Sequence, residues 1–172
     1  MFPLINQINE AIGDLNEAAT RLIQAIRNCP ELAQLPDGQM LFRGYGHEYS
    51  QHDIVFTKAI RTDRHPRDLH LRWHNLFDDF FEQKFGIRFR SASLFTTGYF
   101  VAASHYGTPY IVIPAGGFKF CWSPAIEDPV NEPQLRAEPP ESVTKLHDNG
   151  MMGTYRVDNF AGAVASDCEV MI

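Results

Sequence analysis

Short runs of strand-forming residues, most of them bordered by glycine, proline or other turn residues, recur through the second half of this chain. Some of these runs alternate apolar and polar side chains and others are apolar throughout, and both patterns are typical of strands in a small sheet. The predicted strands are residues 39–44, 87–93, 110–114, 118–122 and 167–172. A chain that pairs several such short strands needs helices or loops to cover the sheet.

Three segments have the pattern of helices instead. Apolar side chains recur at alternating steps of three and four through residues 4–28, and Cys29-Pro30 ends this helix. Residues 69–85 form a second helix that Gly86 closes, and residues 99–105 are compatible with a short third one. Because the long helices lie near the front of the chain and the strands follow, the sequence predicts an α+β fold.

The chain has 172 residues, which fits one domain with a helical appendage. We expect residues 1–36 to form an amphipathic helix packed on the domain, and residues 37–172 to form the domain itself. The apolar stripe of the helix also has the spacing of a coiled-coil seam, so self-association through it is the alternative. Residues 129–154 are rich in proline, glutamate, asparagine and glycine and predict an irregular excursion that includes Pro139-Pro140.

Charge and cysteine content narrow the functional class. The net charge is −6, with 15 Lys and Arg against 21 Asp and Glu, which is the opposite of the balance in most proteins that bind phosphate backbones. The basic residues gather between positions 58 and 90, which suits an anionic ligand in a local pocket. Cys29, Cys121 and Cys168 are widely spaced and predict no disulfide framework. With no basic leader and no long apolar run, we expect a cytoplasmic protein without a membrane span.

Polar side chains at three predicted strands are candidates for chemistry. Arg43 closes the first strand before Gly44, and the pairs Ser91/Ser93 and Asp167/Glu169 each share one face of a later strand. Each has an ordinary structural alternative: an ion pair for Arg43, a satisfied strand hydroxyl for Ser91 and a solvated carboxylate for Glu169. The order of the three is more informative than any one of them.

Phe42-Arg43-Gly44, then Phe89 to Ser93, then Asp167 to Ile172 resemble the arginine–serine–glutamate pattern of the ADP-ribosyltransferases. In that family an aromatic-Arg-Gly strand comes first, a Ser-Thr-Ser strand followed by a helix comes next, and a Glu-x-Glu or Gln-x-Glu strand comes late. Gly98 to Gly107 corresponds to the helix after the middle strand. Departures are Ala92 in place of Thr, Asp167 in place of Glu or Gln, and an insertion over residues 127–153. The resemblance covers residues 41–172 with gaps and implies an α+β fold of split antiparallel sheets.

The resemblance also implies an activity: transfer of ADP-ribose from NAD to a macromolecule, with release of nicotinamide. Arg43 would hold the pyrophosphate, since a guanidinium fork suits phosphate oxygens. Ser91 would fix the nicotinamide ribose, and Glu169 would bind a ribose hydroxyl and stabilise positive charge in the transition state. Asp167 would face the nucleophile and help to accept its proton. The catalytic candidates are thus Glu169, Asp167 and Ser91, and the NAD-binding candidates are Arg43, Gly44, Ser91, Ser93, Tyr99 and Tyr106.

The acceptor is expected to be a protein in preference to a nucleic acid, and the compact chain gives the impression of a phage or bacterial effector. Alternatives are a non-catalytic binding or inhibitor protein on the same fold, an NAD hydrolase or another enzyme of this fold, and an assembly protein that uses the N-terminal helix. Arginines in residues 61–68 would contact the cofactor's phosphates or an acidic or nucleic-acid target. His70 and His74 lie four apart on a helix, but without a third ligand they indicate structural roles rather than a metal site.

Overall fold

A computed structural model describes residues 16–46, 62–67, 69–114, 116–136 and 150–172 of the chain. The first half of the predicted N-terminal helix and the Pro139-Pro140 segment therefore lie outside the described residues. The described part is an α+β structure with one antiparallel sheet, so the predicted fold class is confirmed. Within the described ranges, no helix has the length and hydropathy that a bilayer crossing requires.

The sheet has five strands in the order β3-β1-β2-β5-β4. Their bounds are β1 Leu41–Tyr45, β2 Phe95–Thr97, β3 Thr108–Val112, β4 Cys121–Trp122 and β5 Glu169–Met171. All neighbours are antiparallel. An early and a late strand thus flank the middle of the sheet, because β2 lies between β1 and β5.

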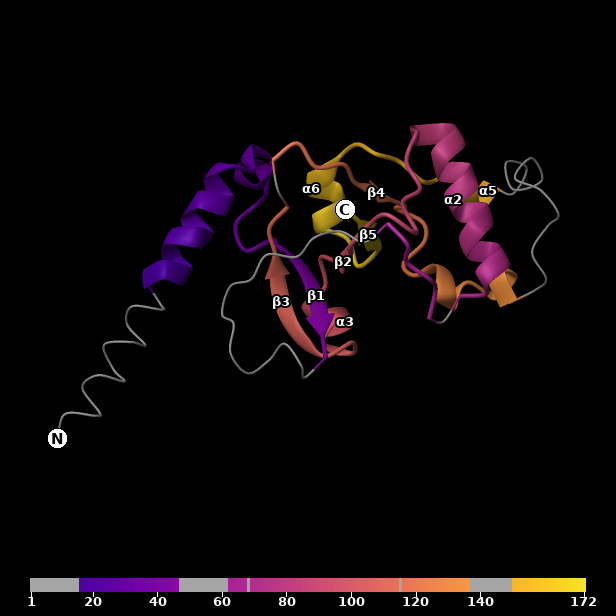
Figure 1. Cartoon of the computed structure of the whole chain (residues 1–172), viewed down its shortest axis with the longest axis horizontal. Helices are drawn as coiled ribbons and strands as arrows, with labels where there is room; N and C mark the ends of the chain where they lie inside the picture. The colour runs from indigo at the N-terminus through magenta and orange to yellow at the C-terminus, as the bar shows by residue number, and fades with distance from the viewer. Residues whose placement is uncertain (1–15, 47–61, 68, 115, 137–149) are drawn as a thin grey trace.

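The pairing between β1 and β2 is shorter than the pairing between β1 and β3. Residues 41–45 of β1 pair with residues 108–112 of β3 along their whole length, whereas β1 pairs with β2 at Phe42 opposite Thr97. In Figure 1, β1 and β3 run side by side at one edge, while β5 and β4 lie further toward α2. The split sheets that the resemblance implied are therefore two parts of one hydrogen-bonded sheet.

Helix α2, Leu71–Phe85, is the longest complete helix among the described elements. Trp73, Phe77, Phe80 and Phe81 make its buried face, at the helical spacing that the sequence predicted. Its end also matches the prediction, because Gly86 adopts a left-handed conformation with φ 75° and its N–H bonds to the carbonyl of Glu82.

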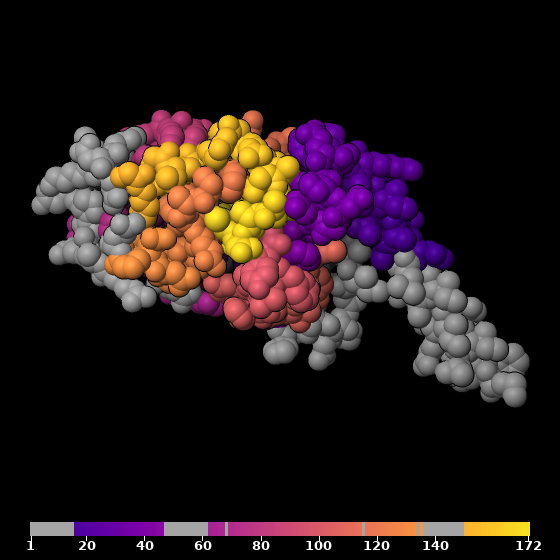
Figure 2. Space-filling view, turned by 180° about the vertical axis from the view of Figure 1, so that it is seen from behind, coloured from indigo at the N-terminus to yellow at the C-terminus, as the bar shows by residue number. Residues whose placement is uncertain are grey.

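Two hydrophobic clusters lie against opposite faces of the sheet. Successive residues of β5 and β4 divide between them: Met171 and Cys121 belong to the cluster of α2, whereas Val170 and Trp122 belong to the other. This division follows from the period of two in a strand. The second cluster includes residues of α6, Phe160–Val164, and of β1. Figure 2 shows the C-terminal segment (yellow) between the segment that includes β1 (indigo to purple) and residues 120–136 (orange).

Shorter elements complete the described structure. The predicted third helix is confirmed as α3, Phe100–Ser104. The described part of the predicted irregular excursion over residues 129–154 contains short helical turns. These turns are η3 Pro129–Asn131, η4 Pro133–Arg136 and α5 Gly150–Gly153, and the 3-10 turn η1, Pro30–Gln34, follows the N-terminal helix. All three cysteines are buried and free.

The N-terminal helix is described over residues 16–27 and projects from one side of the molecule, away from α2 (Figure 1). Leu22 and Ile26, two members of its apolar stripe, are 40% and 43% exposed. In this part of the helix, the stripe does not pack on the domain as we expected.

The prediction of a strand over residues 87–93 is wrong. Residues 89–91 form a turn, and the strand begins only at Phe95. The carboxylate of Asp78 on α2 accepts the backbone N–H groups of both Arg90 and Ser91, at 2.8 and 3.2 Å. These N–H groups are therefore bonded to a side chain of α2 instead of to a neighbouring strand.

Candidate functional site

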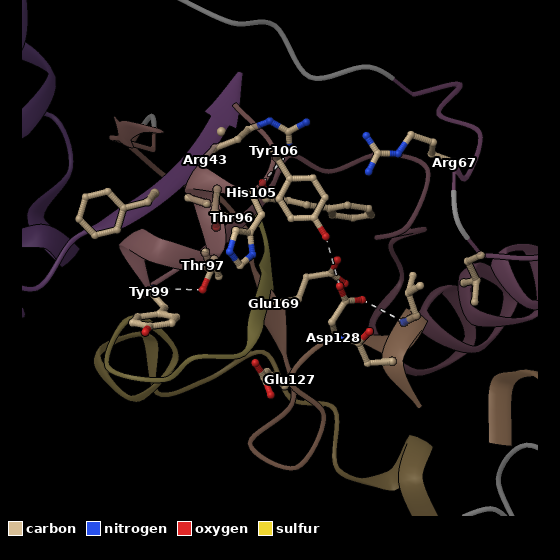
Figure 3. Close-up of a pocket in the computed structure, with 18 of the residues that line it drawn as sticks. Arg43, Arg67, Thr96, Thr97, Tyr99, His105, Tyr106, Glu127, Asp128 and Glu169 are labelled. Atoms are coloured by element: carbon tan, nitrogen blue, oxygen red, sulfur yellow. Dashed lines mark hydrogen bonds between the residues drawn. The ribbon is translucent and has the colours of Figure 1, made fainter. Parts of the chain in front are cut away.

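A cavity of about 590 Å³ opens where β1, β2 and β5 meet α3 and the loop after β4. This volume lies within the range of small-molecule and cofactor sites, roughly 300–1,000 Å³. Its walls come from segments far apart in the sequence, including residues 42–46, 64–67, 95–106, 127–131 and 167–169. Figure 3 shows side chains from these segments converging on one space.

Most of the predicted site residues line this cavity. Arg43 and Gly44 contribute from β1, Tyr99 and Tyr106 from either end of α3, and Asp167 and Glu169 from the C-terminal segment. Asp167 precedes β5 in a bend, so it does not share a strand face with Glu169 as predicted. Both carboxylates nevertheless line the same cavity.

Ser91 and Ser93 do not line the cavity, which corrects their predicted position. The Ser91 hydroxyl donates to Asp78 and lies 3.2 Å from Nε2 of His74. Ser93 is 5% exposed, and its hydroxyl is buried without a hydrogen-bond partner among the described residues. The reason is the turn at residues 89–91, which places both serines before the strand instead of on it.

Thr96 and Thr97 occupy the middle strand that we had assigned to the serines. Both line the cavity, and Thr97 lies opposite Phe42 of β1 and opposite Glu169 of β5. Residues directly opposite each other in antiparallel strands project to the same face, so Thr97 and Glu169 are neighbours. The sequence held a signal for this strand: Phe95-Thr96-Thr97 are strand-forming residues, and Gly98 follows them just before α3.

Arg43 is held by a backbone group. Its Nη1 donates to the carbonyl oxygen of Phe95 at 2.6 Å, and its Nε is buried without a hydrogen-bond partner among the described residues. A carbonyl leaves the positive charge of a guanidinium uncompensated, unlike a carboxylate. Arg43 therefore keeps both charge and donor capacity for an anionic ligand.

Two further arginines approach the same residue. The guanidinium carbon of Arg64 lies 3.8 Å from the ring centre of Phe95, and that of Arg90 lies 4.4 Å from it. Both distances are typical of cation–π contacts. With Arg43 on the Phe95 carbonyl, three guanidinium groups gather around one residue of β2. The sequence had marked the arginines of residues 61–68 for a phosphate, and Arg64 and Arg67 both line the cavity.

Carboxylates gather on the other side of the cavity. Figure 3 shows Arg43 and Arg67 along one side and Glu127, Asp128 and Glu169 along the other. The hydroxyl of Tyr106 donates to Asp128 at 3.4 Å. Burial raises the pKa of this phenol, and the negative charge of Asp128 raises it further, so Tyr106 donates as a neutral phenol at neutral pH.

No protein-family model, curated protein or solved structure matches this chain.

Glu169 has the electrostatic environment of a site residue. Its side chain is 17% exposed and pairs with Nη1 of Arg90. Burial raises the pKa of the Glu169 carboxyl, and the charge of Arg90 opposes that rise. A largely desolvated carboxylate in a cavity can accept a hydroxyl hydrogen or stabilise a nearby positive charge strongly, because little water screens it.

His70 and His74 both make hydrogen-bond contacts at the start of α2. His70 Nδ1 accepts the N–H of Arg72 at the start of α2, and His74 Nε2 lies by Ser91. Among the described residues, no three His, Cys, Asp or Glu side chains converge as metal ligands do. His74 is 2% exposed and lines the cavity, so it belongs to the site through its position.

Proposed function

We propose that this protein is an NAD-dependent mono-ADP-ribosyltransferase that modifies a macromolecule, a protein in preference to a nucleic acid. The observation that carries the proposal is the strand order, in which β1, β2 and β5 are neighbours and bring Arg43, Thr97 and Glu169 to one cavity. The sequence resemblance calls for a guanidinium, a hydroxyl and a carboxylate in this chain order. Arg43, Thr97 and Glu169 all line the cavity, and Thr97 would take the role that we had assigned to Ser91 from the sequence.

The arginines around Phe95 support binding of a dinucleotide. A pyrophosphate carries negative charge on several oxygens, and Arg43 donates to a carbonyl and not to a carboxylate, so its positive charge remains for one of them. Arg64 adds positive charge within the same space, whereas the charge of Arg90 is paired with Glu169. Tyr99 and Tyr106 are 46% and 52% exposed and line the cavity, where an aromatic face suits the nicotinamide or adenine ring.

The proposed reaction breaks the bond between the ribose anomeric carbon and the nicotinamide nitrogen. The bonding electrons leave with nicotinamide, and positive charge develops on the ribose. Glu169 would stabilise that charge and accept a ribose hydroxyl. Thr97 lies opposite Glu169. Its hydroxyl, which donates to the Asp167 carbonyl and accepts the Tyr99 N–H, would orient the sugar. The acceptor then forms the new bond to the anomeric carbon, and Asp167 would take the acceptor's proton.

The test uses NAD labelled in its adenylate part, the purified full-length protein and a cell lysate. We expect wild type to transfer label to a macromolecule and to release nicotinamide, and Glu169→Gln to lose at least a hundredfold in rate. Glu17→Gln is the matched control, because Glu17 is an exposed carboxylate on the N-terminal helix, remote from the cavity.

Equal label with wild type and Glu169→Gln would defeat the proposal. Nicotinamide release without label on any macromolecule would instead indicate NAD hydrolysis. Binding of NAD with neither product would indicate the non-catalytic alternative.

A further inference from the structure

The partner of Glu169 is a buried arginine that the sequence did not mark as a site residue. Arg90 is 4% exposed, lines the cavity, and donates from Nη1 to Oε1 of Glu169. Its Nε is buried without a hydrogen-bond partner among the described residues. A guanidinium so far removed from water is stabilised mainly by the carboxylate it faces.

The backbone around Arg90 is held in place from α2. Asp78, which is fully buried, accepts the N–H of Arg90 at 2.8 Å, the N–H of Ser91 at 3.2 Å and the Ser91 hydroxyl. The guanidinium of Arg90 also lies 4.4 Å from the ring centre of Phe95 and 6.0 Å from that of Phe77. Backbone bonds and two aromatic rings therefore fix the direction in which Arg90 reaches.

The carboxyl group of Glu169 needs a compensating charge to do the chemistry proposed for it. Burial favours its protonated form, which accepts a ribose hydroxyl less well and cannot stabilise positive charge. One oxygen of the carboxylate, Oε1, bonds to Arg90, which leaves Oε2 to face a ligand. A fixed cation on one oxygen thus sets both the charge of the carboxylate and its orientation.

We propose that Arg90 is a positioning residue that holds Glu169 ionised and oriented toward the cavity. The reaction that this serves rests on the proposed function, whereas the effect of Arg90 on Glu169 does not. Two other charged groups also act on the carboxyl of Glu169: Arg64 before α2 lowers its pKa and Asp128 in the loop after β4 raises it. The charge of Glu169 in turn raises the pKa of Tyr106 after α3, Cys121 in β4 and Tyr155 after α5.

The experiment measures the titration of Glu169 directly. Full-length protein is labelled with glutamate carrying ¹³C at the carboxyl carbon, and the Glu169 resonance is assigned as the one missing in Glu169→Gln. We expect the pKa of Glu169 to rise by about 1–3 units in Arg90→Met, because an opposite charge at contact distance is removed. Arg90→Lys keeps the charge and should bring the pKa back toward that of wild type.

Arg88→Met is the matched control. Arg88 lies two residues earlier, pairs with Asp79 and Glu82 at 2.8 Å each, has its Nε 3.9 Å from Oδ2 of Asp78, and does not line the cavity. Its removal should leave the Glu169 titration unchanged. An unchanged Glu169 pKa in folded Arg90→Met would overturn the proposal, and so would an equal rise in Arg88→Met.

A measurement on wild type covers the case in which Arg90→Met does not fold. The Nε–H resonance of Arg90, assigned from its loss in Arg90→Lys, should shift with pH at the same midpoint as the Glu169 carboxyl. Independent midpoints would overturn the proposal.

Activity separates this inference from the proposed function. If Arg90 controls the Glu169 titration and the protein does not consume NAD, the proposed function fails and the inference stands. If NAD is consumed and the pKa of Glu169 in Arg90→Met equals that in wild type, the inference fails and the function stands. If both hold, the pH profile of NAD turnover in Arg90→Met should move to higher pH in step with the Glu169 carboxyl.

Discussion

Single side chains of this protein are best understood from their nearest polar groups, and Ser91 is the clearest case. In the sequence it lies in an alternating run and belongs to the stretch from Phe89 to Ser93 that resembles the serine part of the ADP-ribosyltransferase pattern. In the structure its hydroxyl and its N–H both bond to the buried carboxylate of Asp78, thirteen residues earlier. Thr97 has the hydroxyl that lies opposite Glu169. From the sequence we had placed a serine hydroxyl in the position that Thr97 occupies opposite Glu169.

Gly44 lies where any side chain would clash with the backbone of α3. A Cβ built at this position would lie 2.1 Å from the carbonyl oxygen of Ala103 and 2.9 Å from Tyr106. Gly44→Ala should therefore push α3 away from β1 and lower the free energy of unfolding by about 1–3 kcal/mol or more. Urea denaturation measures this.

Gly46→Ala is the control for that substitution, because no described atom lies within 4 Å of a Cβ built there. We expect a change within about 0.5 kcal/mol. Equal losses for the two glycines would show that α3 does not pack against β1 as described.

We expect the free energy of unfolding to depend on pH because His74 is buried. Burial lowers its pKa below the ordinary value of 6.5, and the charges of Arg90 and Arg64 lower it further, against the opposing charge of Asp78. The unfolded chain therefore binds a proton near pH 6.5 while the folded protein does not. By linkage, the free energy of unfolding should fall as pH drops below about 6.5 toward the lower folded pKa.

Urea midpoints measured between pH 5 and 8 test this. His74→Gln should reduce the acid sensitivity, whereas His65→Gln, at an exposed position, should retain it. Identical pH dependence in wild type and His74→Gln would contradict the prediction.

At the scale of elements, the sequence predicted long elements better than short ones. Helix α2 has fifteen residues, a continuous aromatic face and a glycine stop, so its local signals agree with each other. Strand β2 has three residues, too few for a period-two pattern to stand out from the alternating run before it. Its place is decided by pairing with β1 and β5, which are distant in sequence.

We expect substitutions on the buried face of α2 to lower the free energy of unfolding strongly. Phe81 is fully buried and its ring centre lies 4.9 Å from that of Tyr155, across the cluster. Phe81→Ala should cost about 3–5 kcal/mol of unfolding free energy, since it leaves a cavity that rigid neighbours cannot fill.

Leu71→Ala on the same helix is the comparison, because Leu71 is 48% exposed. It should cost less than about 0.5 kcal/mol. Guanidinium denaturation of both variants distinguishes the buried face from the exposed one, and a large loss from Leu71→Ala would contradict the orientation of α2.

At the scale of the whole molecule, the cavity exists because the two ends of the domain meet. β1 comes early, β5 comes last, and β2 joins them, so Arg43 and Glu169 lie in one space although 126 positions separate their numbers (169 − 43). The two hydrophobic clusters on opposite faces hold this junction from both sides. Ligand binding in the cavity should therefore stabilise the whole domain.

The corresponding prediction concerns thermal unfolding. If the cavity binds NAD as proposed, NAD at a hundred times its dissociation constant should add about 2.7 kcal/mol to the free energy of unfolding and raise the Tm of wild type. Arg43→Ala should lose most of this increase at the same NAD concentration. Arg27→Ala removes an exposed arginine of the N-terminal helix and should keep it. An equal Tm increase in Arg43→Ala and wild type would place NAD outside this cavity.

From the sequence alone we could predict the α+β class, helix α2 with its glycine end, the short α3, and the strand that carries Arg43. Each depends on interactions between residues a few positions apart, which periodicity and capping signals report. The strand order, the exposure of the N-terminal helix, the position of Thr97 instead of Ser91 opposite Glu169 and the pairing of Arg90 with Glu169 needed the tertiary structure. Those features are decided by contacts between segments tens of residues apart, where the partner of a hydroxyl or a guanidinium depends on which backbone passes beside it.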